Sequence, residues 1–310
     1  MKTKHYYGLP YKGGKQTYAK ELFDVLPRGG RFVDLFCGGC AMTDYALTNK
    51  LYDSYLANDL NTMITQAYID ALNGKLIPQD IHFVTREYYK SYPEDAYARI
   101  CYSFGSRNAS YMYSEQRGCA AKSAHYVICY NDYALIKDIV SEEALSYLQS
   151  NVTADDWPTR RLQFTAALKA LNRNLVDIGI MYQKMTTQHN CAEHLRNIKR
   201  ILHLAKPYDN LTTSNISYEQ YEHQDGDVVY CDPPYAGTDG YVWTGEFDTD
   251  KFWQWARTRE YPVYVSESKA PDDFVAIWTK HRPNYLSKPT TWRDGQLYMV
   301  ENLFIHERFL

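Results

Sequence analysis

The sequence predicts an α/β fold in which a mostly parallel sheet is interrupted by an inserted, mainly helical domain. Short apolar runs at residues 31–36 and 227–231 are typical of strands that are buried on both faces. Between about residues 66 and 190 the alternation of strand and helix patterns stops. With 310 residues, of which 45% are hydrophobic, the chain is long enough for two domains with sizeable cores.

The first strand-and-helix unit carries a glycine turn. Residues 31–36 are followed by Cys37-Gly38-Gly39-Cys40 and by a helical pattern from Ala41. Glycines at such a turn let a ligand approach the backbone closely. The next strand pattern ends at Asp59, 20 residues after Gly39, where an acid accepts hydrogen bonds from a ribose diol. This spacing indicates a nucleotide-like cofactor, although the turn is not GxGxxG. The alternative is two unrelated loops.

The middle of the chain is organised differently. Residues 89–113 are rich in aromatic side chains, and helical patterns occur at about 141–150 and 160–174. We therefore interpret residues 66–190 as an inserted domain, and residues 1–65 with 191–310 as the catalytic domain that binds the cofactor. Residues 157–201 contain eight basic and two acidic residues, in a chain whose net charge is −3. This excess predicts either a surface that follows phosphates or an ordinary solvated helix face.

The alternation returns in the C-terminal part. We expect helices and strands at residues 194–204, 209–214, 218–221, 227–231, 252–258 and 261–266. Pro271 is well placed to begin a further helix. Residues 297–300 and 302–306 are expected to close the chain as a hairpin.

The strand at 227–231 ends in Asp232-Pro233-Pro234-Tyr235. The prolines donate no backbone hydrogen bond, so strand pairing must stop there, and strand ends are where open α/β sheets bind ligands. The Asp232 carboxylate and a carbonyl beside the prolines could accept two hydrogen bonds from one planar amino group. Tyr235 offers a ring face on which a flat ligand can stack. The alternative is an ordinary strand-to-turn junction.

Composition excludes several classes of protein. The seven cysteines are scattered and odd in number, which is unlike a secreted disulfide framework. The single CxxC has no second pair and no histidine cluster, so we expect no metal site. The sequence shows no signal peptide and no apolar run of membrane-spanning length, so a cytoplasmic setting without a membrane partner is expected.

Four short motifs follow one another in a specific order. They are Tyr11-Lys12-Gly13-Gly14-Lys15, Asp34-Leu35-Phe36-Cys37-Gly38-Gly39, Asn58-Asp59-Leu60-Asn61 and Asp232-Pro233-Pro234-Tyr235. In this order they resemble the motifs of Dam-type DNA adenine-N6 methyltransferases of the alpha group. The resemblance covers roughly residues 7–65 and 190–310. It is weakest over residues 66–190, so no recognised DNA sequence can be carried over.

The resemblance implies a Rossmann-like S-adenosylmethionine-dependent sheet with an inserted target-recognition domain. It implies S-adenosylmethionine as cofactor, double-stranded DNA as partner and an adenine flipped out of the duplex. We expect a monomer, with a dimer on DNA as the alternative, in the cytoplasm of a bacterial or phage-infected cell. The implied catalytic residues are Asp232, Pro233, Pro234 and Tyr235. The implied cofactor-binding residues are Tyr11, Lys15, Asp34, Phe36, Gly38, Asp59 and Asp232.

The sequence departs from the family pattern near the expected cofactor adenine, and three alternative functions are considered. At Asn215-Ile216 the family often has an acid and a phenylalanine near the cofactor adenine. The rivals are a methyltransferase acting on RNA or another amine, a catalytically silent DNA-binding relative, and an NAD-dependent dehydrogenase. The intact Asp232 and Lys15 argue against a silent relative. A dehydrogenase would leave the Asp-Pro-Pro-Tyr motif unexplained and would require GxGxxG.

Overall fold

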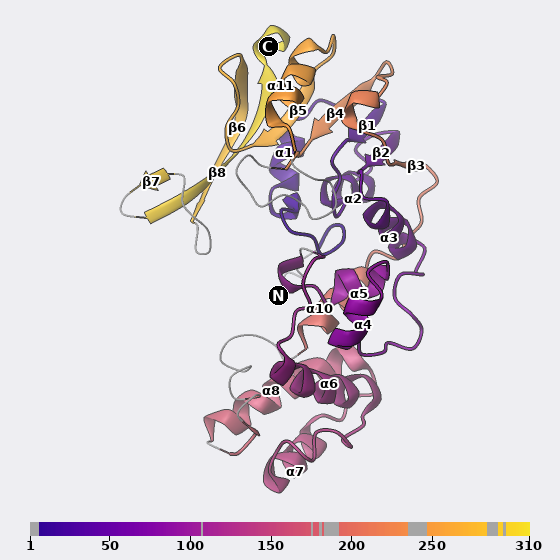
Figure 1. Cartoon of the computed structure of the whole chain (residues 1–310), viewed down its shortest axis with the longest axis vertical. Helices are drawn as coiled ribbons and strands as arrows, with labels where there is room; N and C mark the ends of the chain where they lie inside the picture. Colours follow the sequence, from indigo (N-terminus) through magenta and orange to yellow (C-terminus); the bar gives the residue numbers. More distant parts are fainter. Residues whose placement is uncertain are drawn as a thin grey trace. The chain divides into compact units, whose positions relative to one another are not determined.

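The computed structural model describes residues 6–106, 108–174, 176–179, 182, 192–234, 247–283, 291–293 and 296–310. The chain forms two compact units (Figure 1). The first unit comprises Met1–Leu9, Gly13–Leu72 and Lys206–Leu310, and the second comprises Pro10–Lys12 and Asn73–Ala205. Each unit is described separately below.

The first unit contains the predicted sheet. Its strands run in the order β3-β2-β1-β4-β5-β8-β6, and β7 pairs with β8 off this path. Strands β3, β2, β1, β4 and β5 are parallel to one another, whereas β8 is antiparallel to β5, β6 and β7. The bounds are β1 Arg31–Asp34, β2 Ser54–Asn58, β3 Leu211–Ser214, β4 Asp227–Cys231, β5 Val263–Glu267, β6 Phe274–Pro283, β7 Thr291–Arg293 and β8 Gln296–His306. The prediction of an α/β fold with a mostly parallel sheet is confirmed.

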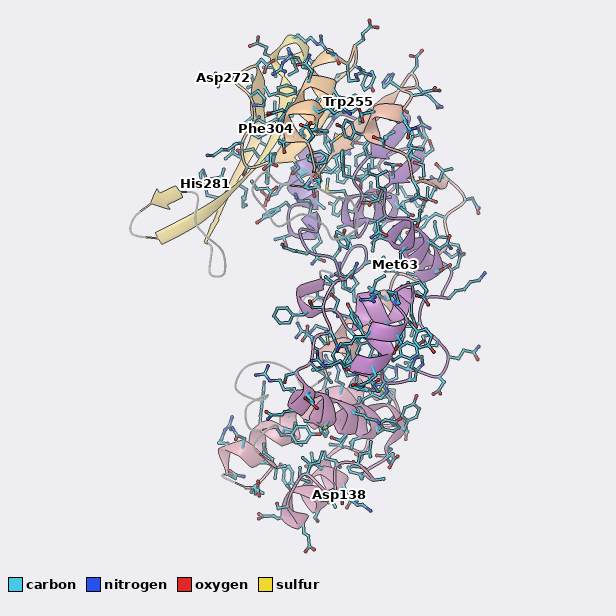
Figure 2. All side chains as sticks on the ribbon, viewed as in Figure 1. Met63, Asp138, Trp255, Asp272, His281 and Phe304 are labelled. Carbon is cyan, nitrogen blue, oxygen red and sulfur yellow. The ribbon has the colours of Figure 1, made fainter. Side chains whose placement is uncertain are left out.

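Both faces of this sheet are buried because successive strand residues point to opposite sides. Phe32 and Tyr230 pack on one face with side chains of α1 (Ala19–Val25) and α2 (Ala41–Thr48). Val33 and Val229 pack on the other face with α11 (Thr249–Thr258). Trp255 of α11 and Phe304 of β8, labelled in Figure 2, belong to this second core. The remaining helical segments of this unit are η1 Lys15–Thr17, α3 Thr62–Leu72, η3 Tyr218–Gln220 and η4 Glu307–Phe309.

Two predictions for the C-terminal part are wrong. Pro271 does not begin a helix, because the residues after it form strand β6, which pairs antiparallel with β8 from Phe274 onwards. The β-branched and aromatic residues from Val275 to Thr279 favour a strand, and pairing with β8 outweighs the proline start signal. Residues 297–306 are not a hairpin either, since they lie in the single continuous strand β8.

The second unit is helical in its described part. Its elements are α4 Arg86–Ser91, α5 Ala96–Cys101, η2 Phe104–Ser106, α6 Glu115–Tyr130, α7 Glu142–Asn151, α8 Trp157–Arg173 and α10 Glu193–Leu202. Several of these helices begin where a side chain accepts a hydrogen bond from an otherwise unpaired backbone N–H, as Ser114 and Asp156 do. No described helix in either unit is long and apolar enough to cross a membrane.

The interior of the second unit contains a chain of buried polar rings. The Tyr113 hydroxyl lies 2.6 Å from His194 Nδ1, and His194 Nε2 lies 3.0 Å from His125 Nδ1. His125 Nε2 lies 2.7 Å from the Ile81 carbonyl oxygen, to which it can only donate. Burial lowers the pKa of both histidines and favours neutral rings. In neutral rings with that donation, His125 Nδ1 accepts from His194 Nε2–H, and His194 Nδ1 accepts from the Tyr113 hydroxyl.

Candidate active site

The candidate site lies where strands β1, β2 and β4 end. In the sheet, β1 has β2 on one side and β4 on the other, so the strand order reverses between β1 and β4. Parallel strands bring their carboxyl ends to one edge, and ligands bind at such a reversal point in open α/β sheets. The residues that follow these three strands include Cys37-Gly38-Gly39-Cys40, Asp59 and Asp232.

Asp59 fastens the glycine turn to the end of β2. Its two carboxylate oxygens accept hydrogen bonds from the backbone N–H groups of Gly38 and Asn61, each at 2.9 Å. Gly38 has φ of 45°, in the left-handed region that glycine adopts without strain. The predicted pairing of turn and spaced acid is therefore a physical contact, and Asp59 keeps lone pairs for a further donor.

The N-terminal loop packs directly against the same turn. Leu9 N–H donates to the Gly39 carbonyl at 2.7 Å, and Gly8 N–H donates to Asp44 Oδ2 at 3.0 Å. A Cβ atom at Gly8 would lie 2.7 Å from the Ala41 nitrogen, and Gly8 has φ of 63°. Glycine is thus required at position 8 for close approach as well as for conformation. Sequence reasoning identified a glycine-bearing loop here but not this contact.

Lys15, which is buried, and Asp232, which is half-buried, form an ion pair at the end of β4. Lys15 Nζ lies 2.6 and 2.7 Å from the two carboxylate oxygens of Asp232. Burial alone would lower the pKa of Lys15, but the carboxylates of Asp232 and Glu301 outweigh it and raise that pKa. Burial raises the pKa of Asp232 to about 6, although Lys15 opposes the shift. Lys15 therefore holds Asp232 in place and favours its ionised form.

A second carboxylate faces Lys15 from strand β8. Glu301 Oε1 lies 3.5 Å from Lys15 Nζ and accepts a hydrogen bond from Ser266 Oγ at 3.2 Å. The Glu301 side chain is buried. Sequence reasoning missed this residue, although an acid inside the apolar run Met299–Ile305 is a signal of a buried charge.

Asp34 and Phe36 lie beneath the turn. Asp34 is buried and accepts a hydrogen bond from Thr43 Oγ1 at 2.9 Å, while its other oxygen has no hydrogen-bond partner among the described residues. Burial raises the pKa of Asp34 to about 7. The Phe36 ring packs against Tyr218 and Phe252. Their predicted contacts with a cofactor stay predictions.

The other predicted residues are distributed as follows. Pro233 and Pro234 follow Asp232 directly, and Pro233 is buried. Tyr235 lies outside the described residues. Tyr11 belongs to the second unit, where the neighbouring Lys12 N–H donates to the Ser106 carbonyl at 2.9 Å. The predicted roles of Tyr11, Pro233, Pro234 and Tyr235 remain predictions.

The position that departs from the family pattern has a structural use. Asn215 Nδ2 donates to the Asp59 carbonyl at 2.7 Å and to Thr65 Oγ1 at 2.8 Å. The neighbouring Ile216 is held by Asn58, whose Oδ1 accepts from Ile216 N–H and whose Nδ2 donates to the Ile216 carbonyl, each at 3.0 Å. Asn58 and Asn215 therefore hold the segment after β3 beside the end of β2.

The cysteines of the turn are packing groups. The sulfur atoms of Cys37 and Cys40 lie 3.4 Å apart, and both side chains are buried. Burial raises the pKa of both thiols, which makes them poor nucleophiles. In the part of the chain that the structure describes, no group of three His, Cys, Asp or Glu side chains could hold a metal ion.

The charges at this edge suit a cationic ligand. Four carboxyl groups, from Asp34, Asp59, Asp232 and Glu301, lie around the turn and the β4 end, where Lys15 is the cation that pairs with Asp232 and Glu301. An excess of carboxylates in a partly buried edge attracts positive charge. Asp232 can in addition accept from an amino group, because each oxygen bound by Lys15 has a second lone pair.

Comparison with known proteins gives two similarities. The family model of the D12 class N6 adenine-specific DNA methyltransferases matches residues 11–257. The retron Ec67 DNA adenine methylase of Escherichia coli is 24% identical to this chain over 267 residues, which are 84% of this chain and 76% of that protein.

Proposed function

This chain belongs to the D12 class N6 adenine-specific DNA methyltransferase family, and from that premise we propose that Asp232 carries its chemistry. The enzyme transfers a methyl group to the N6 amino group of adenine in DNA. The observation that carries the proposal is the ion pair between Lys15 and Asp232 at the end of β4. It fixes a carboxylate acceptor at the edge of the sheet where ligands bind.

The proposed methyl donor is S-adenosylmethionine. When bound, this cofactor supplies an electrophilic methyl group on a positively charged sulfonium sulfur. The carboxylates at the sheet edge fit such a cation, and the glycine turn leaves room for a ligand beside its backbone. Asp59 is the proposed partner of the ribose hydroxyls, and Gly38 the proposed neighbour of the methionine part. Asp34 and Phe36 are the further proposed residues of this pocket, and the role of Tyr11 as a cofactor-binding residue is proposed from the family resemblance alone.

The proposed role of Asp232 is to hold and orient the adenine amino group. Its carboxylate and the Pro233 carbonyl accept one hydrogen bond each from the amino hydrogens, which aims the nitrogen lone pair at the methyl group. As the new N–C bond forms and the S–C bond breaks, positive charge moves onto the nitrogen, and a nearby carboxylate stabilises it. The nitrogen then loses one proton to solvent. Pro234 stops strand pairing at this point, and Tyr235 is proposed to stack on the flipped base.

The second unit is proposed to recognise the DNA target. It corresponds largely to the predicted recognition domain of residues 66–190, with residues 1–65 and 191–310 as the proposed catalytic domain. Support comes from the exposed basic residues Lys169 and Arg173 of α8, which could contact phosphates. Not all basic residues of this span are available, because Arg160 is buried and donates to carbonyl groups. We propose that the enzyme acts on double-stranded DNA as a monomer.

The test is mass spectrometry of nucleosides from adenine-unmethylated DNA that has been incubated with protein and S-adenosylmethionine. Wild-type protein should produce 6-methyladenine, and Asp232→Ala should produce at least about 100-fold less. Asp24→Ala is the matched control, because Asp24 is exposed and pairs with Lys20 on the surface of α1. Duplex DNA, single-stranded DNA and RNA should be compared in parallel. Methylation of RNA alone would contradict the proposed substrate.

A further inference from the structure

Glu301 lies outside the matched family span of residues 11–257 and outside all four sequence motifs, yet its carboxylate faces the ammonium that holds Asp232. We propose that Glu301 is a positioning residue for methyl transfer: it fixes Lys15 beside Asp232 and leaves the three ionisable groups with one net negative charge. The proposal rests on the role of Asp232 proposed above. Lys15, Asp232 and Glu301 are called the charge cluster below.

The charge cluster is assembled from separate elements of the first unit. Lys15 comes from η1, Asp232 follows β4, and Glu301 comes from β8. Glu301 is itself held, because Ser266 Oγ of β5 donates to it at 3.2 Å. The next residue of β8, Asn302, donates through Nδ2 to the Ser268 carbonyl at 3.0 Å. Strand β8 is thus fastened to β5 and to the residue after β5 at Glu301 and at the position that follows it.

The charge cluster differs from an ordinary ion pair because it contains two carboxylates and only one ammonium. Side-chain exposure is 6% for Lys15 and 7% for Glu301, so solvent screens their interaction little. One ammonium can neutralise only one of two carboxylates. Burying a second carboxylate is costly, and a well-packed apolar residue at position 301 would be expected if stability alone mattered.

The extra negative charge has a use in the reaction. Positive charge develops on the adenine nitrogen next to Asp232 as the methyl group is transferred. With Glu301 ionised, Lys15 is shared between two carboxylates, and Asp232 remains a stronger acceptor than it would be in an isolated pair with Lys15. Glu301 therefore acts on the substrate through Lys15 and Asp232, without touching it.

The experiment compares Glu301→Gln with wild-type enzyme in single-turnover methylation of duplex DNA across pH 5–9. Glutamine keeps the size and the oxygen acceptor for Lys15 and Ser266 but removes the charge. The rate at pH 8 should fall about tenfold or more, with the KM for S-adenosylmethionine changed less than about twofold. The acid limb of the pH–rate profile should move to lower pH, because the Glu301 charge contributes to raising the pKa of Asp232. A purely structural role would not move that limb.

Assigning the acid limb of the pH–rate profile to Asp232 depends on which titratable groups lie near its carboxylate. In the described chain the titratable groups that act on it are Lys15 from η1, Glu301 from β8 and Asp34 from β1, with Tyr230 and Cys231 from its own strand. Glu301→Gln alters one of these and leaves the others in place. Glu21→Gln is the matched control, since Glu21 pairs with Lys280 at 2.9 Å in an exposed ion pair of the same unit. That control should behave as wild type.

The outcomes are distinct. A Glu301→Gln enzyme with wild-type rate and an unmoved acid limb overturns the inference, while loss of activity in Asp232→Ala would still support the proposed function. If wild-type enzyme makes no 6-methyladenine, the proposed function fails and the inference falls with it. If Glu301→Gln melts below the assay temperature, Ser266→Ala carries the test, because it loosens Glu301 and keeps all three charges. A rate fall of about threefold or more at unchanged KM then supports the inference, and an unchanged rate overturns it.

Discussion

Lys15 Nζ contacts both carboxylate oxygens of Asp232, at 2.6 and 2.7 Å, across 217 residues of sequence. The contact joins the first glycine-bearing loop to the end of β4. Lys15 is buried and Asp232 is half-buried, with side-chain exposures of 6% and 19%, so removing either charge leaves the other poorly compensated. The pair therefore couples the stability of the first unit to the geometry of the proposed active site.

Replacing Lys15 by methionine should destabilise the first unit by about 3–5 kcal/mol at pH 8, because the half-buried Asp232 carboxylate would lose its cation and the buried Glu301 carboxylate its contact with Lys15. Chemical denaturation monitored by tryptophan fluorescence measures the change in free energy of unfolding. The loss should be smaller at pH 5, where Asp232, whose pKa is raised to about 6, can take up a proton.

Lys20→Met is the control for this prediction. Lys20 also pairs with an acid, Asp24, at 2.7 Å, but both side chains are exposed. Exposed pairs contribute little to stability. An equal loss in the two lysine variants would contradict the importance of burial for the Lys15 pair.

The sequence was informative where local chemistry decides the structure. Strands β1, β2, β4 and β5 were predictable because their apolar runs end at glycine, acid or proline residues. Strand β6 was not, since Pro271 carries a helix-start signal and the competing pairing with β8 is formed by residues far along the chain. Local pattern cannot reveal a partner of that kind.

The same distinction holds for the candidate site. The residue types of Asp59 and Asp232 indicated a polar edge, and the sheet topology brings the ends of β2 and β4, which precede them, to one edge of the sheet. Lys15 reaches this edge from η1. Glu301 belongs to no motif, and only the antiparallel strand β8 brings it to Lys15. The contact between Gly8 and the glycine turn was equally hidden, because it depends on how two loops pack.

Methylation should weaken at acidic pH. Asp232 must be ionised to accept from the amino group, and its pKa is raised to about 6, first by burial. The ionised fraction falls as pH drops through that value, so the single-turnover rate at pH 5 should be about tenfold below its plateau. Asp24→Asn should keep this limb, because Asp24 is exposed on α1 and pairs with Lys20. A rate that stays flat down to pH 5 would show that Asp232 is not the titrating acceptor.

The second unit should lose stability as pH falls from 6.5 toward 4. Burial lowers the pKa of His125 to about 4 and holds that of His194 well below 6.5. Both pKa values are depressed, so the unfolded state binds protons first. The contribution of the two neutral histidines to the stability of the second unit is therefore full above pH 6.5. Below that pH it is lost by about 1.4 kcal/mol per pH unit for each histidine.

Hydrogen exchange of the α6 and α10 amides measures this loss locally. His203→Gln, at an exposed position, should leave the pH dependence as in wild type. In His125→Leu the number of protons taken up on unfolding, which sets the pH dependence of stability, should fall by about one. If the two variants show the same slope, the buried ring chain is not its source.

Buried and exposed basic residues of α8 should differ in how much their mutation lowers the stability of the second unit. Arg160 is buried and donates to the carbonyl oxygens of Ile128, Cys129, Ala154 and Asp155. Arg160→Ala should destabilise the second unit by about 3 kcal/mol or more, because these carbonyl groups lose their donor. Lys169 and Arg173 are exposed on the same helix, so replacing both by alanine should leave its stability close to wild type.

DNA binding measured against salt concentration separates the two roles. If Lys169 and Arg173 contact phosphates, the double alanine variant should reduce the slope of log K against log salt by about 0.9 for each lost contact. Arg160→Ala, measured where it is still folded, should keep the wild-type slope, because its guanidinium already binds carbonyl groups. An unchanged slope in the double variant would place the phosphate contacts on another surface of the protein.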